Sequence, residues 1–493
     1  MSIYYKSTRG GQSDMSCSQA IVKGLADDGG LFVPSDIPKI DLPFEKLAKM
    51  KYTELAFYII QKFFPEIDNL KECIESAYDE KFDSKDKVEL VERCGVSFLE
   101  LYHGPTAAFK DMALSLLPYL LTSSAKKSSI DKDIVILAAT SGDTGKAALA
   151  GFAGVEGTKI VVFFPNDGVS AIQKMQMVTQ SESNTCVIGI DGNFDDAQTG
   201  VKNIFADNEL KEKLSENGFM LSSANSINIG RLVPQIVYYV YSYVKLLSQG
   251  KVKDGEKVNF VVPTGNFGNI LAGYYAMNMG IPVNKLICAS NENNVLFDFI
   301  STGVYDRKRE LVKTNSPSMD ILVSSNLERL LYHLSGGNSG EVKKFMDKLS
   351  SEGSYSVGQD IKNKLSLFYG GFTSEDQTLE TIKYAYENCS YLMDTHTAVA
   401  YKVYEDYKKS TGDDTYTVIA STASPFKFTK SVSTAIGMDA DEDEFQLMYE
   451  LSKESSVKVP YGLDGIEKKE IVHKTTCGKQ SMENVLSDFL GVK

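Results

Sequence analysis

The sequence predicts an α/β protein with two lobes, each built on a parallel sheet, preceded by a small, mainly helical N-terminal domain. Short β-rich runs alternate with helix-length segments from residue 96 onward. A second set of such runs begins at residue 258, after a long apolar segment. The first 94 residues instead carry the periodicity of helices. Alternation of strands and helices is typical of parallel sheets covered by helices.

The N-terminal domain is expected over residues 1–94, with helices at 52–64 and 70–82, where apolar residues recur every three to four positions. The two lobes are expected within residues 95–437. Strands are predicted at 96–101, 134–139, 159–164, 186–190, 258–262, 286–290 and 417–421. An apolar helix is predicted at 227–247 and a helical insertion at about 325–410. Residues 438–493, which begin with an acidic run, form a C-terminal extension to which we assign no chemistry.

Composition narrows the class of protein. The 493 residues include 52 Lys and Arg against 65 Asp and Glu, a formal charge of −13. Binding to nucleic acid or to acidic membranes needs a basic surface, so neither is expected. No apolar run reaches the length of a membrane span, and the polar start does not resemble a signal peptide, so we expect a cytoplasmic protein.

Cysteine and histidine usage predicts neither a disulfide framework nor a metal site. The seven cysteines are odd in number and widely scattered, and none forms a C-x-x-C pair. Reduced thiols are therefore the simpler interpretation. The four histidines are too dispersed for a zinc site that could be read from the sequence.

The first candidate loop joins the strand ending at Ala139 to a helix beginning near Gly145. The first N–H groups of a helix have no internal partner, so such a junction suits a carboxylate or a phosphate. The alternative is that the polar residues of the turn merely cap the helix. These residues are Thr140, Ser141, Gly142, Asp143 and Thr144.

Two known motifs fail on spacing: the P-loop of nucleotide-binding proteins at this loop, and the nucleophile elbow of hydrolases at residues 168–172. A P-loop would need glycine where Thr140 stands and a hydroxyl residue where Ala147 stands. A nucleophile elbow would need glycine at Ile172. Nucleoside triphosphate binding is therefore not favoured.

The second candidate loop follows the strand that ends at Pro263, where Gly265 and Gly268 bracket Asn266 and Phe267. A turn of this kind can direct several backbone amides at one phosphate. It does not match the G-x-G-x-x-G pattern of dinucleotide sites. A glycine-rich turn without a ligand is the alternative.

The third candidate is Lys110, which lies among apolar residues after a Pro-Gly-containing turn. Burial lowers the pKa of a lysine, and the neutral amine is a nucleophile able to form a Schiff base. The alternatives are a lysine that reaches water or that pairs with Asp111.

Several long segments give the chain a resemblance that spans nearly its whole length. The sequence resembles pyridoxal-phosphate enzymes of the tryptophan-synthase-β type (fold type II) and, among them, the longer subtype of the threonine synthase family. The segments that carry the resemblance are Y-Y-K-S-T-R-G-G at 4–11, S-Q-A-I-V-K-G-L-A-D-D-G-G-L-F-V-P at 18–34, H-G-P-T-A-A-F-K-D at 103–111, S-A-N-S-I-N-I-G-R-L-V-P-Q-I-V-Y-Y at 223–239 and S-P-S-M-D-I-L-V-S-S-N-L-E-R-L-L at 316–331.

The resemblance implies roles for the residues that match. Lys110 would form the Schiff base with pyridoxal 5'-phosphate, Asp143 would lie near the phenolic oxygen, and Thr422 would face the pyridine nitrogen. The cofactor phosphate would bind at Gly265, Asn266, Phe267, Gly268 and Asn269. The substrate carboxylate would bind at Thr140, Ser141 and Thr144, and the substrate phosphate at Asn225, Ser226 and Arg231, with Lys146 and Lys427 as possible helpers. Alternatively, Asn225 and Ser226 cap a helix and Arg231 forms a surface ion pair.

The chain departs from the family pattern in two places. Ser424 and Phe426 stand in S-P-F-K-F, where the family usually has H-P-A-K-F, and Thr395 stands in D-T-H-T, where it has D-P-H-T. The first departure removes a histidine after Thr422. The second lies beside His396, which we take to be structural.

The resemblance implies conversion of O-phospho-L-homoserine and water to L-threonine and phosphate, by a monomer or homodimer. Two alternatives remain open. One is another enzyme with the same cofactor, such as a serine/threonine dehydratase or a cysteine synthase, which needs no second phosphate site. The other is a non-catalytic relative that senses the cofactor or a phosphorylated metabolite.

Overall fold

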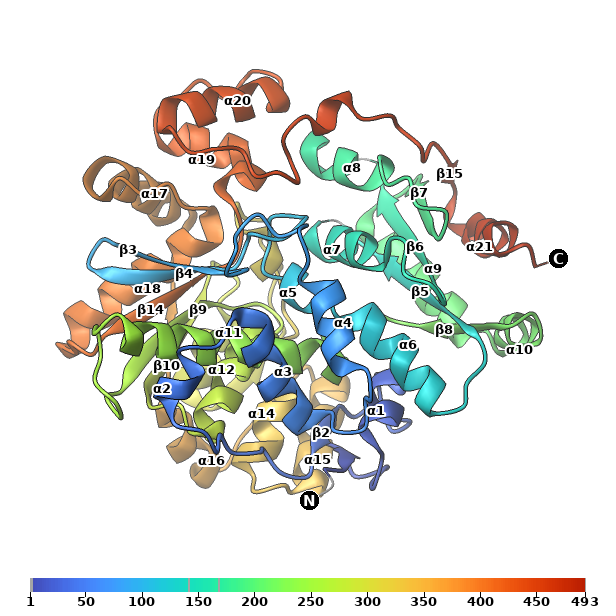
Figure 1. Ribbon diagram of the computed structural model, residues 1–493, viewed down its shortest axis with the longest axis horizontal. Helices are drawn as coiled ribbons and strands as arrows, with labels where there is room; N and C mark the ends of the chain where they lie inside the picture. The colour runs from blue at the N-terminus through green and yellow to red at the C-terminus, as the bar shows by residue number, and fades with distance from the viewer. Residues whose placement is uncertain (1–2, 141, 167–168, 493) are drawn as a thin grey trace.

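The computed structural model describes residues 3–140, 142–166 and 169–492, which form two mainly parallel sheets, two small antiparallel sheets and covering helices (Figure 1). The predicted α/β class with two lobes is confirmed. Ser141, one of the predicted site residues, lies outside the described residues. None of the helices described is long and apolar enough to cross a membrane.

The larger sheet has six strands in the order β13-β10-β9-β14-β4-β3. All neighbours run parallel except the edge pair β3 and β4. The strand before Lys110 therefore lies next to β14, near the other end of the chain, where Ser97 pairs with Val418. The strands are β3 (Glu89–Arg93), β4 (Val96–Glu100), β9 (Val258–Pro263), β10 (Val283–Ser290), β13 (Phe368–Phe372) and β14 (Thr417–Ser421).

The smaller sheet has five parallel strands in the order β15-β7-β6-β5-β8. They are β5 (Asp133–Ala139), β6 (Thr158–Pro165), β7 (Thr185–Ile190), β8 (Phe219–Ser222) and β15 (Thr476–Cys477). The outer strand β15 comes from the C-terminal extension, which crosses from α20 to the far edge of this lobe (Figure 1).

The N-terminal region combines four helices with a small antiparallel pair, β1 (Tyr5–Ser7) and β2 (Phe32–Pro34). Its helices are α1 (Cys17–Lys23), α2 (Phe44–Leu47), α3 (Tyr52–Phe63) and α4 (Leu70–Ala77). Apolar residues of α3 pack against the long helix α11 (Ile229–Ser248). The predicted helices at 52–64, 70–82 and 227–247 thus correspond to α3, α4 and α11.

The remaining helices cover both faces of both sheets. In the smaller lobe they are α5 (Asp111–Leu114), α6 (Leu117–Lys127), α7 (Asp143–Phe152), α8 (Ala171–Val178), α9 (Phe194–Ala206), α10 (Asn208–Glu216) and α21 (Met482–Leu490). In the larger lobe they are α12 (Gly268–Met279), α13 (Val295–Thr302), α14 (Leu327–Leu334), α15 (Ser339–Ser351), α16 (Gln359–Lys364), α17 (Glu375–Cys389), α18 (Thr395–Thr411), α19 (Thr429–Ala435) and α20 (Glu444–Ser455). A second small antiparallel sheet, β11 (Val304–Asp306) with β12 (Ser354–Ser356), completes the fold.

Alternate side chains along the central strands pack into two different hydrophobic cores, one on each face of the sheet. In β9, Phe260 and Val262 join the core that contains α11 and α12, whereas Val261 joins the core under α18. Burial on both faces accounts for the nearly continuous apolar runs that predicted these strands. The C-terminal ends of the two parallel sheets are left to carry loops, and ligands of open α/β sheets bind at such ends.

The prediction of reduced thiols is wrong for one pair of cysteines. Cys94, in the turn between β3 and β4, forms a disulfide with Cys389 at the end of α17, with the two Cα atoms 5.3 Å apart. Nothing in the sequence spacing indicates this pair, because the two residues meet only through the packing of α17 beside the sheet. The other five cysteines are free.

Candidate functional site

The segment before Lys110 is held against β14 at the C-terminal end of the larger sheet. Phe109 donates its N–H to the carbonyl oxygen of Thr422 at 2.8 Å, and Ala108 forms an isolated bridge with Ala423. Lys110 itself immediately precedes the single-turn helix α5. These backbone contacts place the lysine and Thr422 on neighbouring segments.

Lys110 is half-buried and does not pair with Asp111, which was one of the two alternatives. Its Nζ donates to Ser318 Oγ at 3.2 Å, and Asp111 instead accepts from the N–H and hydroxyl of Thr106, at 2.8 and 2.6 Å. Loss of water around the ammonium lowers the pKa of Lys110 to about 8; Asp143 opposes this shift and Lys427 and Arg231 add to it. The fraction of neutral amine near neutral pH is therefore larger than for a free lysine.

Asp143 is a buried carboxylate surrounded by lysines. Its Oδ1 lies 2.7 Å from Lys427 Nζ and 3.0 Å from Lys146 Nζ, and its Oδ2 accepts from Ser318 Oγ at 3.4 Å. Burial alone would raise its pKa, but Lys427, Lys146 and Lys110 outweigh burial and hold the pKa of Asp143 well below its usual range. Asp143 is therefore ionised. Lys146 and Lys427, predicted only as helpers, complete this cluster, and burial followed by the charge of Lys427 lowers the pKa of Lys146 to about 7.

The loop from Gly265 to Asn269 enters α12 without a side-chain cap. Phe267 occupies the N-cap position in the left-handed region (φ 62°), a conformation found in backbone turns that collect N–H groups around an anion. A Cβ on Gly265 would lie 2.6 Å from the Ser318 carbonyl oxygen, so only glycine fits this close approach. The loop therefore presents free helix N–H groups at the edge of the larger sheet.

Asn269 is oriented by two tyrosines. Its Oδ1 accepts from the hydroxyls of Tyr238 and Tyr239 at 2.6 and 2.7 Å, which leaves its buried Nδ2 without a hydrogen-bond partner. A buried amide donor with no partner is costly unless a ligand accepts from it. Asn266, in contrast, is exposed.

Arg231 does not form the surface ion pair that was its alternative interpretation. It is 3% exposed, its Nη1 donates to the Ala224 carbonyl oxygen at 2.8 Å, and its Nε has no hydrogen-bond partner. Among the described residues no carboxylate lies within ion-pair distance of it. Burial lowers its pKa to about 10, so the guanidinium remains charged at neutral pH.

The other predicted substrate residues are placed differently. Asn225 is exposed and Ser226 half-buried, and neither caps α11, because Asn228 is the N-cap and accepts from the Gly230 N–H at 2.8 Å. Thr140 accepts from the N–H groups of Gly142 and Gly145, at 3.0 and 3.2 Å, so its hydroxyl caps its own loop. Thr144 is half-buried at the start of α7.

Ser318 is the site residue that sequence reasoning missed. Its hydroxyl lies between Lys110 and Asp143, and its N–H donates to His396 Nε2 at 3.2 Å. His396 in turn directs Nδ1 at Asp394 Oδ2, 2.8 Å away. The only available signal was its position in the block at 316–331. The two departures from the family pattern do not disturb the contacts of Ser318. Ser424 caps the turn after Thr422, and Thr395 donates its hydroxyl to the Asn315 carbonyl oxygen.

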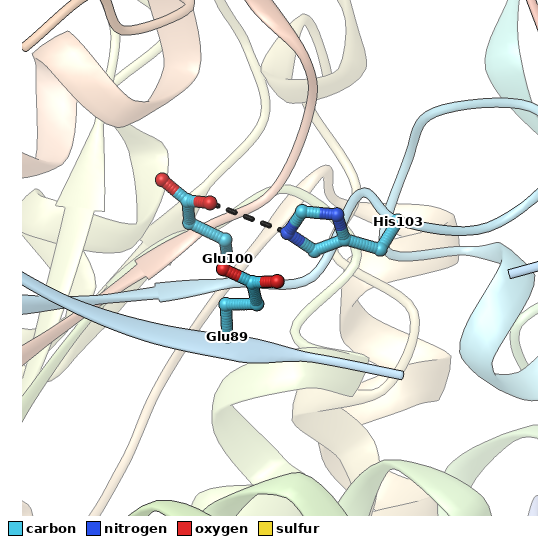
Figure 2. A group of neighbouring side chains, drawn as sticks. All are labelled: Glu89, Glu100 and His103. Carbon is cyan, nitrogen blue, oxygen red and sulfur yellow. Dashed lines mark hydrogen bonds and ion pairs between the residues drawn. The ribbon is translucent and has the colours of Figure 1, made fainter. Parts of the chain in front are cut away.

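One group of potential metal ligands occurs among the described residues, formed by Glu89, Glu100 and His103 (Figure 2). Both His103 ring nitrogens already face carboxylates, at 2.7 Å from Asp83 and 3.2 Å from Glu100. Burial lowers the pKa of His103, but these two carboxylates outweigh it and raise the pKa to about 9. A protonated imidazole has no lone pair for a metal, so we assign this group as an ion pair.

Family profiles match most of the chain. Residues 4–78 match "Threonine synthase N terminus", residues 89–359 match "Pyridoxal-phosphate dependent enzyme", and residues 397–469 match "Threonine synthase, C-terminal". Threonine synthase of Schizosaccharomyces pombe is 38% identical over 473 residues, which cover 89% of this chain and 90% of the relative. The chain belongs to the threonine synthase family. It is therefore a pyridoxal-phosphate enzyme of fold type II.

Solved structures and other relatives support this assignment. The crystal structure of PLP-bound threonine synthase from Brucella melitensis matches with a TM-score of 0.88 and 33% identity, over 99% of both chains. The yeast threonine synthase structure matches equally well. Human threonine synthase-like 1 is 41% identical over 434 residues, which are 85% of this chain and 58% of that protein. The chain thus spans just over half of that relative.

The residues present fit pyridoxal 5'-phosphate. The uncapped start of α12, the left-handed Phe267 and the unpartnered Asn269 Nδ2 suit the cofactor phosphate. Lys110, with its lowered pKa, suits the cofactor aldehyde. As placed by the structure, these groups lie on loops that all follow strands of the larger sheet.

The rate of cofactor loading is expected to rise with pH through about 8. An amine reacts with an aldehyde only in its neutral form, and a pKa of about 8 for Lys110 means that protonation would suppress the reaction below this value. The measurement is the initial rate of growth of the visible absorption band when pyridoxal phosphate is added to cofactor-free protein between pH 6 and 10. A midpoint near the value of a free lysine, about 10.4, would contradict the burial of this amine.

Proposed function

We propose that the protein converts O-phospho-L-homoserine and water to L-threonine and phosphate. The observation that carries the proposal is Arg231, a buried guanidinium that lacks a carboxylate partner within the described part of the chain. Its charge helps to lower the pKa of Lys110, which supports assigning the two groups to one site. If the cofactor phosphate binds at the start of α12, Arg231 stays free to bind another anion, such as the phosphate of a substrate.

Excess positive charge supports the same proposal. Lys110, Lys146 and Lys427 are gathered around the ionised carboxylate of Asp143, and the charge of Arg231 also acts on Lys110. Buried charges are stable only when they are balanced, so the site is suited to ligands that carry several negative charges. A phosphorylated cofactor and a phosphorylated amino acid together supply them.

The chain's own residues would act in the following way. Lys110 Nζ, freed when the substrate amine replaces it, would take the α-proton and later a β-proton, which its lowered pKa permits. Arg231, with Asn225 and Ser226, would hold the leaving phosphate, and Thr144 would hold the substrate carboxylate at the start of α7, in a loop that the Thr140 hydroxyl shapes. The bound cofactor supplies the electron sink for the carbanion.

Two residues would tune the cofactor without taking part in proton transfer. Thr422, buried at the end of β14, would offer a neutral hydroxyl to the pyridine nitrogen, which restrains protonation of the ring. Asp143 would hold Lys146 and Lys427 in place near the phenolic oxygen. These roles stay predictions, as do the domain bounds, a cytoplasmic location and a monomeric or homodimeric state.

The decisive experiment incubates the purified holoenzyme with O-phospho-L-homoserine and measures phosphate and threonine together. Equal release of both supports the proposal. Release of phosphate with a 2-oxo acid instead of threonine indicates a lyase in which an intermediate is hydrolysed before threonine forms. Turnover of serine, which carries no phosphate, indicates a dehydratase. Absence of any product, with the cofactor band intact, indicates a non-catalytic relative.

A further inference from the structure

Asn326 lies where the two candidate phosphate loops approach each other. It is fully buried, and its Nδ2 donates both to the Ser226 carbonyl oxygen at 3.2 Å and to the Asn266 carbonyl oxygen at 3.0 Å. Its backbone N–H also donates to Asn266 O, at 3.1 Å. One carboxamide therefore links the loop before α11, which contains Ser226, with the loop before α12, which contains Asn266.

Arg329 fixes the orientation of this carboxamide. Its Nη1 donates to Asn326 Oδ1 at 2.5 Å, its Nη2 to the Ile227 carbonyl oxygen at 2.6 Å and its Nε to the Phe32 carbonyl oxygen at 2.9 Å. Arg329 is fully buried, and no carboxylate lies within ion-pair distance of it in the part of the chain that the structure describes. Because Oδ1 accepts from Arg329, Nδ2 must face the two loops.

These contacts determine where the N–H groups of the loop before α12 point. The peptide bonds of the described residues are trans, and in a trans peptide the carbonyl oxygen and the next N–H point in opposite directions. Asn266 O faces Asn326, and Gly265 O accepts from Ser324 Oγ at 2.7 Å. The N–H groups of Asn266 and Phe267 consequently point away from residues 324–326.

The same argument applies to the other loop. Ser226 O faces Asn326 Nδ2, so the N–H of Ile227 points away from it. Ile227 O faces Arg329, and the following N–H, that of Asn228, closes the turn by donating to Asn225 O at 3.1 Å. Residues 324–329 thus contact the carbonyl side of both loops.

We propose that Asn326, oriented by Arg329, is a positioning residue that turns the peptide groups of both loops so that their N–H donors face the two phosphates. The cofactor half of this inference rests on the family assignment, and the substrate half rests on the proposed function. Because one carboxamide holds both loops, a change at Asn326 is expected to affect both phosphate sites.

The test compares pyridoxal phosphate with pyridoxal, which lacks the phosphate. For Asn326→Ala and Asn326→Asp, the preference of the cofactor-free protein for pyridoxal phosphate over pyridoxal is expected to fall by about fivefold to thirtyfold, as for one or two misdirected hydrogen bonds. Asn326→Asp keeps an acceptor for Arg329 but loses the donor to both loops. The dissociation constants are measured by absorption titration, together with the melting temperature of each cofactor-free variant.

Asn338→Ala is the control, because Asn338 stands at the N-cap of α15 as Asn326 stands at the N-cap of α14, and its hydrogen bonds reach neither loop. It is expected to lower the melting temperature and leave the preference unchanged. An unchanged preference in Asn326→Asp would overturn the proposal. If Asn326→Ala does not fold, the uncharged Asn326→Ser is measured in its place, and an unchanged preference in that variant would also overturn the proposal.

The second loop is tested with inorganic phosphate as the probe. Its affinity for the wild-type holoenzyme, followed by the change in the visible band, is expected to fall in Asn326→Asp by a factor similar to that seen for the cofactor. An unchanged affinity would overturn the coupling of the two loops. A wild-type holoenzyme that binds no phosphate would contradict both the proposed function and the substrate half of this inference, whereas the comparison of pyridoxal with its phosphate would still decide the cofactor half.

Discussion

Replacing Lys110 by alanine is expected to remove the visible cofactor band and to lower turnover of O-phospho-L-homoserine by at least about 10³-fold. The side chain is both the nucleophile toward the cofactor aldehyde and the base proposed for the α- and β-protons, and positioned acid–base groups contribute about 10²- to 10⁴-fold each. Absorption after addition of pyridoxal phosphate and release of inorganic phosphate are the two measurements.

Lys126→Ala is the control, because this lysine is exposed in the last turn of α6. It is expected to keep both the band and the activity. A Lys110→Ala protein that still acquires the band would show that another amine, such as Lys146 with its pKa of about 7, reaches the cofactor. That result would end the assignment of Lys110.

Arg231→Ala is expected to reduce kcat/KM for O-phospho-L-homoserine by about 10²- to 10³-fold while the cofactor band persists. Removing one member of a buried, hydrogen-bonded charge pair costs about 2–5 kcal/mol, and each 1.4 kcal/mol is a factor of ten. The Arg231 guanidinium is buried and its Nε is free to donate, so a substrate phosphate would depend on it directly. Steady-state phosphate release gives the rate constants.

Arg93→Ala serves as the comparison for this variant, since Arg93 is exposed at the end of β3. Its kcat/KM is expected to stay within about twofold of wild type, as for most surface substitutions. Unchanged turnover in Arg231→Ala would remove the phosphate role from this arginine. Loss of the cofactor band in the same variant would instead place Arg231 at the cofactor.

Much of the fold follows from local pattern, because strands buried on both faces must be apolar throughout. The runs at 134–139, 159–164 and 258–262 became β5, β6 and β9 for this reason. β13 was not predicted: it lies in a segment expected to be helical, and two of its five residues are glycine. The sheet to which a strand belongs is not encoded locally either, which is why the pairing of β4 with β14 could not be foreseen.

The sequence predicted those parts of the candidate site in which the chemistry requires a particular residue type. A lysine in apolar surroundings and glycines at a strand–helix junction are such cases. Ser318 could not be found in this way, because its role depends only on its contacts with Lys110 and Asp143, and these contacts are known only from the structure. Asn326 and Arg329 lay in a segment that carried the family resemblance, yet their function depends on carbonyl oxygens of distant loops.

The pairing of β4 with β14 also bears on how the protein is made. During translation, β4 emerges long before β14, so until then it lacks its parallel partner and Phe109 lacks the Thr422 carbonyl oxygen to which it donates. Contacts between such distant segments form late and leave apolar strands exposed to aggregation while the chain grows. Loading with the vitamin-derived cofactor must therefore follow synthesis of β14, and a nascent chain that stops before residue 417 will carry Lys110 without its surroundings.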